Sequence, residues 1–185
     1  MADAAGPLVL ASRSPQRRAI LEQLGVDFVV APTDVPEVAA GDPRSVVVEN
    51  ALRKARAAEG GLVLGADTAV ALDEDLYGKP SGEGEARAFL GTLSGRTHEV
   101  WSGIALLEDG VERTAAAMTR VRFRELDEAW LAWYLASGEW RERAGAYAIQ
   151  GLGSALVEEV QGDFWNVVGL PVAELLRLRP GLLLG

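Results

Sequence analysis

Short runs of apolar residues alternate along the chain with segments in which apolar residues recur every three or four positions. The apolar runs at 8–11, 27–31 and 62–72 predict buried strands, because each is short and bounded by turn-forming residues. The periodic segments at 16–24 and 43–59 predict helices that bury one face. The first half of the chain therefore predicts strands that are separated by helices.

The second half contains the same two patterns with more turns. Three further helices are expected at 82–93, 127–137 and 171–178. Two long strands at 97–107 and 110–123 flank an Asp-Gly pair, which is typical of a tight hairpin, and one more strand is expected at 155–160 in a glycine-rich region. Helix-separated strands followed by a hairpin indicate an α/β fold with a mixed sheet and a cleft between its two parts.

Length and composition narrow the class of protein. The chain has 185 residues, of which 49% are hydrophobic, so we expect one domain spanning residues 1–185. The net charge of -9 argues against a nucleic-acid polymer or an anionic membrane as partner. With no cysteine, the chain has neither disulfides nor thiolate metal sites. The N-terminus does not resemble an export signal and no apolar stretch is long enough to span a membrane, so a cytoplasmic location is expected.

A group of hydroxyl and guanidinium side chains gathers where the first helix begins. The stretch ASRSPQRR contributes Ser12, Arg13, Ser14, Arg17 and Arg18 to that end of the helix. Free backbone N–H groups and arginine forks at a helix N-terminus suit a phosphate group. The alternative, a capped surface helix with solvated arginines, is equally compatible with these residue types.

Two further residues stand in unusual surroundings. Asp67 lies inside the apolar run LVLGADTAVAL, and a buried carboxylate needs a cation or hydrogen bonds. Lys79 lies in the turn sequence GKPS, which is not a phosphate-binding P-loop because Pro80 stands where Ser or Thr is required. The only histidine, His98, is expected to have a hydrogen-bonded structural role, since one histidine without cysteine does not make a usual zinc site.

The acids that remain favour a hard metal ion. Glu37 and Asp67 offer carboxylate oxygens, which Mg²⁺ and Mn²⁺ prefer, and Mg²⁺ sites usually combine one or two carboxylates with phosphate oxygens. The expected cofactor is therefore Mg²⁺ or Mn²⁺, and the expected substrate is a polyphosphate.

Five separated motifs also occur in one order along the chain. They are LVLASRSPQRRAIL, ENALRKARA, GADTAV with YGKP, LSGRTHEV, and AGAYAIQGLGSALVEEVQGDFWNVVGLP. In these motifs the chain resembles, over nearly its whole length, the Maf family of nucleoside triphosphate pyrophosphatases, also called septum-formation proteins. The resemblance implies an inosine-triphosphatase-like fold, with an elongated mixed sheet flanked by helices and a cleft between two lobes. It also implies cleavage between the α- and β-phosphates of a nucleotide.

The resemblance extends to substrate choice. GADT and AYAIQG are typical of the branch that acts on dTTP and UTP, where Thr68 and Gln150 fall on positions linked to pyrimidine preference. Gln16 replaces the first arginine of the SPRR motif that is usual in that branch, also at a position linked to specificity. The resemblance thus implies a dTTP/UTP pyrophosphatase, with a 7-methyl-GTP pyrophosphatase as the alternative.

The resemblance and the residue types together assign roles. Asp67 is the expected proton acceptor, with Arg17, Lys54 and Lys79 as catalytic cations. Ser12, Arg13, Ser14 and Arg18 are expected to bind the triphosphate; Gln16, Thr68 and Gln150 to set specificity; and Glu37 with Asp67 to hold the metal.

Two alternatives stay open from the sequence. A nucleotide-binding regulator of septum formation without catalysis would have the same pocket and surface charge. Trp130, Trp133 and Trp140 lie close together along the chain, which is compatible with either a core cluster or a homodimer interface.

Overall fold

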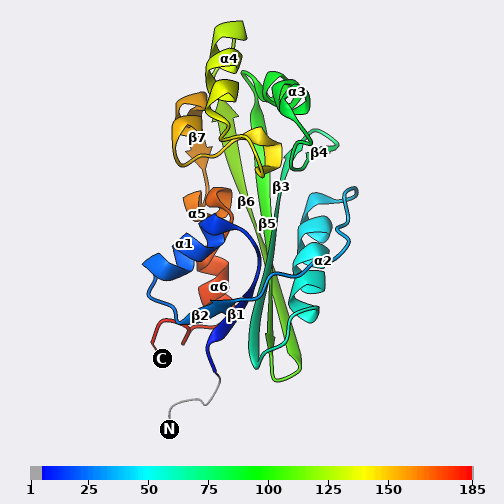
Figure 1. Cartoon of the computed structure of the whole chain (residues 1–185), viewed down its shortest axis with the longest axis vertical. Helices are drawn as coiled ribbons and strands as arrows, with labels where there is room; N and C mark the ends of the chain where they lie inside the picture. Colours follow the sequence, from blue (N-terminus) through cyan, green and yellow to red (C-terminus); the bar gives the residue numbers. More distant parts are fainter. Residues whose placement is uncertain (1–5, 185) are drawn as a thin grey trace.

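A mixed β-sheet runs along most of the elongated molecule (Figure 1). The computed structural model describes residues 6–184. The sheet has seven strands in the order β2-β1-β3-β5-β6-β7, with β4 paired to the far end of β3. The strands are β1 (Leu8–Ala11), β2 (Phe28–Val30), β3 (Leu62–Leu72), β4 (Asp75–Tyr77), β5 (Thr97–Glu108), β6 (Val111–Phe123) and β7 (Val157–Gln161).

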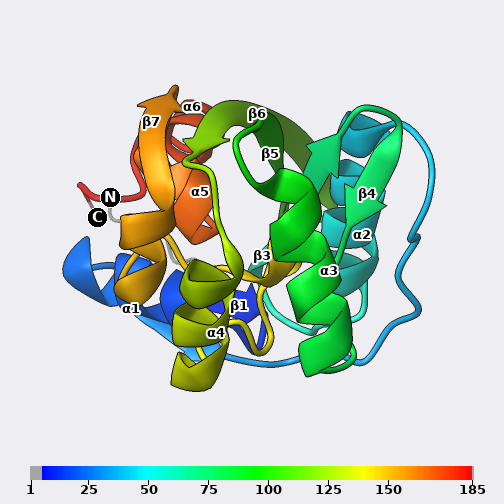
Figure 2. The same ribbon diagram turned by 90° about the horizontal axis from the view of Figure 1, so that it is seen from above.

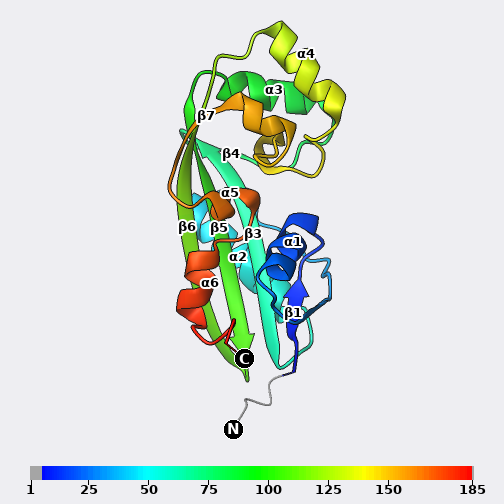
Figure 3. The same cartoon turned by 90° about the vertical axis from the view of Figure 1, so that its left-hand side faces the viewer.

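Six α-helices and two 3₁₀ turns flank this sheet. They are α1 (Pro15–Gln23), α2 (Pro43–Arg56), α3 (Glu83–Leu93), α4 (Glu128–Ser137), η1 (Ala144–Ala146), η2 (Leu152–Leu156), α5 (Phe164–Val168) and α6 (Val172–Leu178). Figure 3 shows α3 and α4 at one end of the long strands, and α1, α2 and α6 around the other end. We call the first group the upper lobe and the second the lower lobe. The expected mixed α/β sheet with two lobes is confirmed.

Helices cover both faces of the sheet in the lower lobe. Successive strand residues point to opposite faces, so Leu8 and Leu10 of β1 join a cluster with α1 and α6, while Val9 and Ala11 join one with α2. Viewed from above, α2 lies across the strands from α1 and α5 (Figure 2). Burial on both faces explains why these strands read as continuous apolar runs.

Two glycines let α2 lie directly on the sheet. A Cβ atom added at Gly65 of β3 would come within 2.1 Å of the carbonyl oxygen of Ala51, and one at Gly103 of β5 within 2.4 Å of that of Val47. Any larger residue at either position would push the helix outward. Because α2 sits this close, polar side chains on its edge reach the middle of β3.

The upper lobe has its own core, built around the far ends of β3, β5 and β6. His98 is buried there, and its Nε2 atom lies 2.8 Å from the hydroxyl of Tyr147. Phe123 packs edge-on against both rings. Burial lowers the pKa of His98 to about 4, so the ring is neutral at pH 7. The expected structural role of His98 is confirmed.

The sequence-based elements differ from the structure in three places. Helix α2 ends at Arg56, short of the expected residue 59, because its last turn tightens through a bond from the N–H of Ala58 to the carbonyl of Ala55. Strand β4 was not expected, since its three residues have no alternation of their own. Helix α5 lies in a segment expected to be irregular, with Asp163 accepting a hydrogen bond from the N–H of Trp165.

The clustered tryptophans differ in burial. Trp140 is buried together with Tyr134 and Leu135 of α4, whereas Trp133 is exposed and packs edge-on against Trp130. Homodimer formation stays a prediction. Each helix in the described part of the chain is too short or too polar to cross a lipid bilayer.

Candidate active site

A cavity of about 750 Å³ opens between the two lobes. We call its lower-lobe side, built from the β1–α1 turn, α2 and β3, the lower wall, and its upper-lobe side, built from the segments around 79 and 141–150, the upper wall. All of the predicted site residues except Arg18 line this cavity. They are Ser12, Arg13, Ser14, Gln16, Arg17, Glu37, Lys54, Asp67, Thr68, Lys79 and Gln150.

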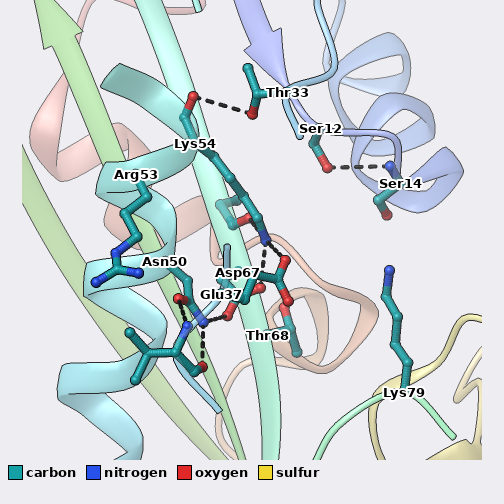
Figure 4. A network of polar contacts seen from close by, with 12 residues as sticks. Ser12, Ser14, Thr33, Glu37, Asn50, Arg53, Lys54, Asp67, Thr68 and Lys79 are labelled. Carbon is teal, nitrogen blue, oxygen red and sulfur yellow. Dashed lines mark hydrogen bonds and ion pairs between the residues drawn. The ribbon is translucent and has the colours of Figure 1, made fainter. Parts of the chain in front are cut away.

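The centre of the lower wall is an ion triad. The Nζ atom of Lys54 lies 2.7 Å from Oδ1 of Asp67 and 2.6 Å from Oε1 of Glu37 (Figure 4). Asp67 lies midway along β3, and Lys54 reaches it from the edge of α2. A mostly buried carboxylate is stable here because the ammonium group lies directly against it.

Asn50 is a polar residue of this wall that the sequence reasoning missed. It lies one helical turn before Lys54 and is buried. Its Nδ2 atom donates to Oδ2 of Asp67 (2.9 Å) and to the carbonyl of Val38 (3.0 Å), and its Oδ1 accepts from the N–H of Val38 (2.7 Å). Asn50 thereby ties the loop that carries Glu37 to Asp67. The motif ENALRKARA contained the information needed to predict Asn50, because Asn50 and Lys54 are four residues apart and such residues share a helix face.

Arg17 forms the second buried charge of the lower wall. Ser14 caps α1 by accepting from the N–H of Arg17 at 3.4 Å, as the sequence predicts. The guanidinium donates to the carbonyl of Gly169 (2.8 Å), the hydroxyl of Ser12 (3.0 Å) and the hydroxyl of Thr68 (3.0 Å). Burial lowers the pKa of Arg17, and the charges of Asp67 and Glu37 oppose that shift.

The upper wall has looser ionic contacts. Lys79 reaches toward the cavity from the loop after β4, and its Nζ lies 3.2 Å from Oε2 of Glu142 on the rim. Two arginines missed in the sequence flank that acid: Arg141 stacks on the ring of Trp140 at 4.6 Å, and burial lowers the pKa of the half-buried Arg143. The cavity therefore has cations on both walls.

Apolar side chains also line the cavity, on both walls and at its floor beside α5. They are Val70, Val100, Tyr147, Ile149, Val167 and Val168. A polar cavity that also has apolar side chains suits a ligand with a charged part and a flat, weakly polar part.

Comparison with known proteins agrees with this geometry. The sequence model of the family described as Maf-like protein matches residues 7–179. The chain belongs to the Maf family. It is 49% identical to the dTTP/UTP pyrophosphatase of Anaeromyxobacter sp. (strain Fw109-5), with 92% of this chain and 87% of the relative covered. It is 46% identical to the dTTP/UTP pyrophosphatase of Thermococcus gammatolerans, with 93% and 95% covered.

A further Maf relative and one solved structure are also similar. The dTTP/UTP pyrophosphatase of Symbiobacterium thermophilum is 45% identical, with 92% of this chain and 91% of the relative covered. The structure of the Staphylococcus aureus Ham1 protein matches with a TM-score of 0.46 and 16% identity, and covers 63% of this chain and 71% of that chain.

One predicted site residue of this Maf protein lies elsewhere. Arg18 points away from the cavity, and its Nε lies 2.7 Å from Oε1 of Glu22, with both side chains exposed to solvent. Arg17 is buried in the lower wall, whereas the side chain of Arg18 leaves the helix about 100° further round and lies in solvent. The expectation that Arg18 binds the triphosphate is therefore corrected.

Two acids of this Maf protein are of the type that a hard metal ion prefers. Within residues 6–184, no cluster of three or more His, Asp or Glu side chains is placed to bind a metal ion. Glu37 and Asp67 nevertheless converge on one cationic group, the ammonium of Lys54. Two carboxylates fit Mg²⁺ or Mn²⁺ when phosphate oxygens and water complete the shell.

Proposed function

We propose that this chain hydrolyses dTTP and UTP to the nucleoside monophosphate and pyrophosphate. The observation that carries the proposal is the ion triad of Asp67, Lys54 and Glu37 in a cavity that Arg17 and Lys79 also line. The names of the relatives, each at least 45% identical over nine-tenths of this chain, support the pyrimidine substrate.

The triphosphate is bound by cations from both walls. Arg13 and Arg17 come from the start of α1, whose free N–H groups add partial positive charge, and Lys79 comes from the upper wall. Arginine forks match phosphate oxygens bidentately, while the lysine acts as a point charge. The two arginines also offset the negative charge that develops on the leaving pyrophosphate.

Asp67 acts as the proton acceptor. It takes a proton from a water molecule as the water oxygen bonds to the α-phosphorus; the bond from that phosphorus to the bridging oxygen breaks, and pyrophosphate leaves. Lys54 and Asn50 each hold one oxygen of the Asp67 carboxylate, which fixes its orientation toward the cavity. Each carboxylate oxygen can accept a second hydrogen bond, so both remain available to water.

Glu37 and Asp67 are the residues that would hold a divalent cation, Mg²⁺ or Mn²⁺. Such an ion supplies charge neutralisation for the phosphate oxygens when it is bound.

Gln150 is proposed to read the base, and Gln16 to influence specificity from the other wall. Both side chains line the cavity, as do the apolar side chains that suit a planar ring. The uracil or thymine edge presents two carbonyl acceptors and one N–H, which a glutamine amide can match. Gln150→Ala is expected to lower the kcat/KM ratio of dTTP to dATP; an unchanged ratio would remove Gln150 from base choice.

A nucleotide panel tests the proposed function. Purified protein is incubated with dTTP, UTP, dATP and 7-methyl-GTP in Mg²⁺ or Mn²⁺, and the products are separated by anion exchange. The expected products are dTMP and UMP with pyrophosphate, and the Asp67→Asn variant, prepared in parallel, is expected to be inactive while binding nucleotide within roughly tenfold of wild type. Tight binding without product would favour the non-catalytic regulator, and preferred cleavage of 7-methyl-GTP would favour that branch.

A further inference from the structure

A one-way chain of hydrogen bonds leads from Arg17 into the protein interior. The Nη2 group of Arg17 donates to Oγ1 of Thr68, which lies 2.9 Å from Oγ of the fully buried Ser102. Oγ of Ser102 in turn lies 3.1 Å from the carbonyl oxygen of Asn166 in α5. Arg17, Thr68, Ser102 and Asn166 come from four different elements.

The direction of this chain follows from counting protons. A hydroxyl group has one hydrogen to donate, and a carbonyl oxygen can only accept. Ser102 gives its hydrogen to the carbonyl of Asn166, so Thr68 must be the donor in the Thr68–Ser102 contact. Thr68 also accepts from Arg17, which has no acceptor atom. The Thr68 hydroxyl therefore has no proton left for a ligand.

Asn166, where this series of hydrogen bonds ends, is itself held by further hydrogen bonds. The Nδ2 group of the buried Asn166 donates to the carbonyl of Val100 (3.0 Å) and to the hydroxyl of Thr119 (3.0 Å). Gly169, which follows α5, accepts from Nε of Arg17 and has a φ of 130° that side chains rarely adopt. Helix α5 thus anchors the guanidinium both directly and through the two hydroxyls.

We propose, on the basis of the proposed function, that Thr68 and Ser102 are positioning residues that act on the substrate through Arg17 and not by contact with the base. This role differs from the base selection that the family resemblance implies for Thr68, and the experiments below distinguish the two. Three N–H groups of Arg17 are used by Gly169, Ser12 and Thr68, which leaves two of the five of a guanidinium for a phosphate. The hydrogen bonds through Thr68 and Ser102 determine which two N–H groups remain for the phosphate. Thr68 therefore affects the affinity for the triphosphate equally for every base.

Removal of each hydroxyl tests this inference. Thr68→Val keeps the shape of the side chain, leaves a buried N–H of Arg17 without a partner, and is expected to raise KM about tenfold. The increase should be the same within twofold for dTTP, UTP and dATP. Ser102→Ala should raise KM in the same direction by a smaller factor, and Thr68→Ser should restore the wild-type value.

A double-mutant cycle with Arg17→Lys separates this route from any other. If Thr68 acts through the guanidinium, Thr68→Val should change KM by less than twofold once Arg17 is replaced. Thr92→Val, on the outer face of α3, is the matched control, and thermal melts show whether each variant is folded. A Thr68→Val effect that persists in the Arg17→Lys background overturns the inference. A dTTP to dATP ratio changed more than tenfold, with Ser102→Ala silent, would instead indicate direct base contact.

The proposed function and this inference fail in distinguishable ways. Affinity for the non-hydrolysable α,β-imido-dUTP, measured by calorimetry, needs no turnover and is expected to fall about tenfold in Thr68→Val. Wild-type protein that binds the analogue but releases no pyrophosphate from dTTP or UTP contradicts the proposed function alone. Equal affinity in wild type, Thr68→Val and Ser102→Ala contradicts the inference alone.

Discussion

The two walls of the cavity have the same kinds of charged groups in very different surroundings. On the lower wall the side chains of Lys54 and Asp67 are 12% and 13% exposed, and hydrogen bonds hold their partners in place. On the upper wall the side chains of Lys79 and Glu142 are 61% and 84% exposed and form an ion pair at 3.2 Å. The Lys54–Asp67 pair is thus in place before any ligand arrives, whereas the Lys79–Glu142 pair lies in solvent.

This difference separates two tasks. Charges in a low-dielectric, pre-arranged setting interact strongly and need no reorganisation during a reaction, which favours the lower wall for the chemical step. Exposed charges are screened by salt and lose side-chain entropy on binding, so they contribute little to a fixed site but attract an anion from solution. We therefore expect changes in the ion triad of the lower wall to affect kcat, and changes on the upper wall to affect KM and its salt dependence.

The largest effect is expected for Lys54→Met. This change keeps most of the length of the side chain and removes the cation that both carboxylates contact. Loss of one pre-arranged charge typically lowers kcat at least 100-fold, or about 3 kcal/mol. Steady-state kinetics with dTTP would measure it.

Lys54→Arg is the control for that change, because it restores the charge with a different shape. We expect it to recover part of kcat, and circular dichroism should show that both variants are folded. If Lys54→Met retained wild-type kcat and only KM rose, the assignment of the chemical step to the lower wall would be wrong.

The next effect concerns His98, a neutral but titratable side chain in the core of the upper lobe. His98 is the only histidine of the chain, and burial lowers its pKa from 6.5 to about 4. Between these values the unfolded chain binds a proton that the folded protein does not, so stability falls as pH drops below 6.5. We expect the free energy of unfolding to decrease by about 2 kcal/mol from pH 7.5 to pH 5, measured by urea titration.

The His98→Gln variant isolates this contribution. It removes the titrating ring and leaves an amide that can still bond to Tyr147. Its free energy of unfolding should be nearly constant between pH 6.5 and pH 5, where carboxylates contribute less. The same slope in both proteins would show that another group causes the pH dependence.

Local sequence signals predicted those features that depend on neighbouring residues. Ser14 caps α1 and Asp127 caps α4, and both are residue types that favour this position. The turn at Asp109 and Gly110 has positive φ angles at both positions, as expected for a tight hairpin. Alternation and apolar runs placed the long strands because both of their faces are buried. These signals need only a few consecutive residues.

The features that were not predicted depend on contacts between distant segments. From the sequence, Ser102 is an ordinary strand residue. Its role depends on contacts with β3 and α5, and through β3 with α1. Arg141 and Arg143 belong to a loop whose position depends on the packing of the upper lobe. The burial of Arg17 could have been predicted from its position in the helix. It lies three and four residues before the buried Ile20 and Leu21, and this spacing places all three on the inward face.

A smaller effect is expected on the upper wall. Lys79→Ala should raise KM for dTTP about threefold. Glu142→Gln should lower KM by a similar factor, because it frees Lys79 for the phosphates. Both changes correspond to the ~1 kcal/mol or less that an exposed ion pair contributes. Both changes should leave kcat within twofold and disappear in 0.5 M salt, since the Debye length then falls to about 4 Å. A kcat loss in Lys79→Ala as large as that in Lys54→Met would show that Lys79 joins the chemistry and that the two walls are not distinct.

The smallest effect is expected for Arg18→Ala, beside the most sensitive part of the lower wall. Arg18 follows Arg17 in the chain, yet it pairs with Glu22 in solvent, an exposed i,i+4 pair whose loss costs little. KM and kcat for dTTP should stay within twofold of wild type, whereas Arg17→Ala should raise KM by tenfold or more, because it removes a buried donor fork. The two arginines are expected to differ only because their side chains leave α1 in different directions. A tenfold KM increase in Arg18→Ala would mean that α1 rotates when the triphosphate binds, and the lower wall would then be less fixed than its hydrogen bonds indicate.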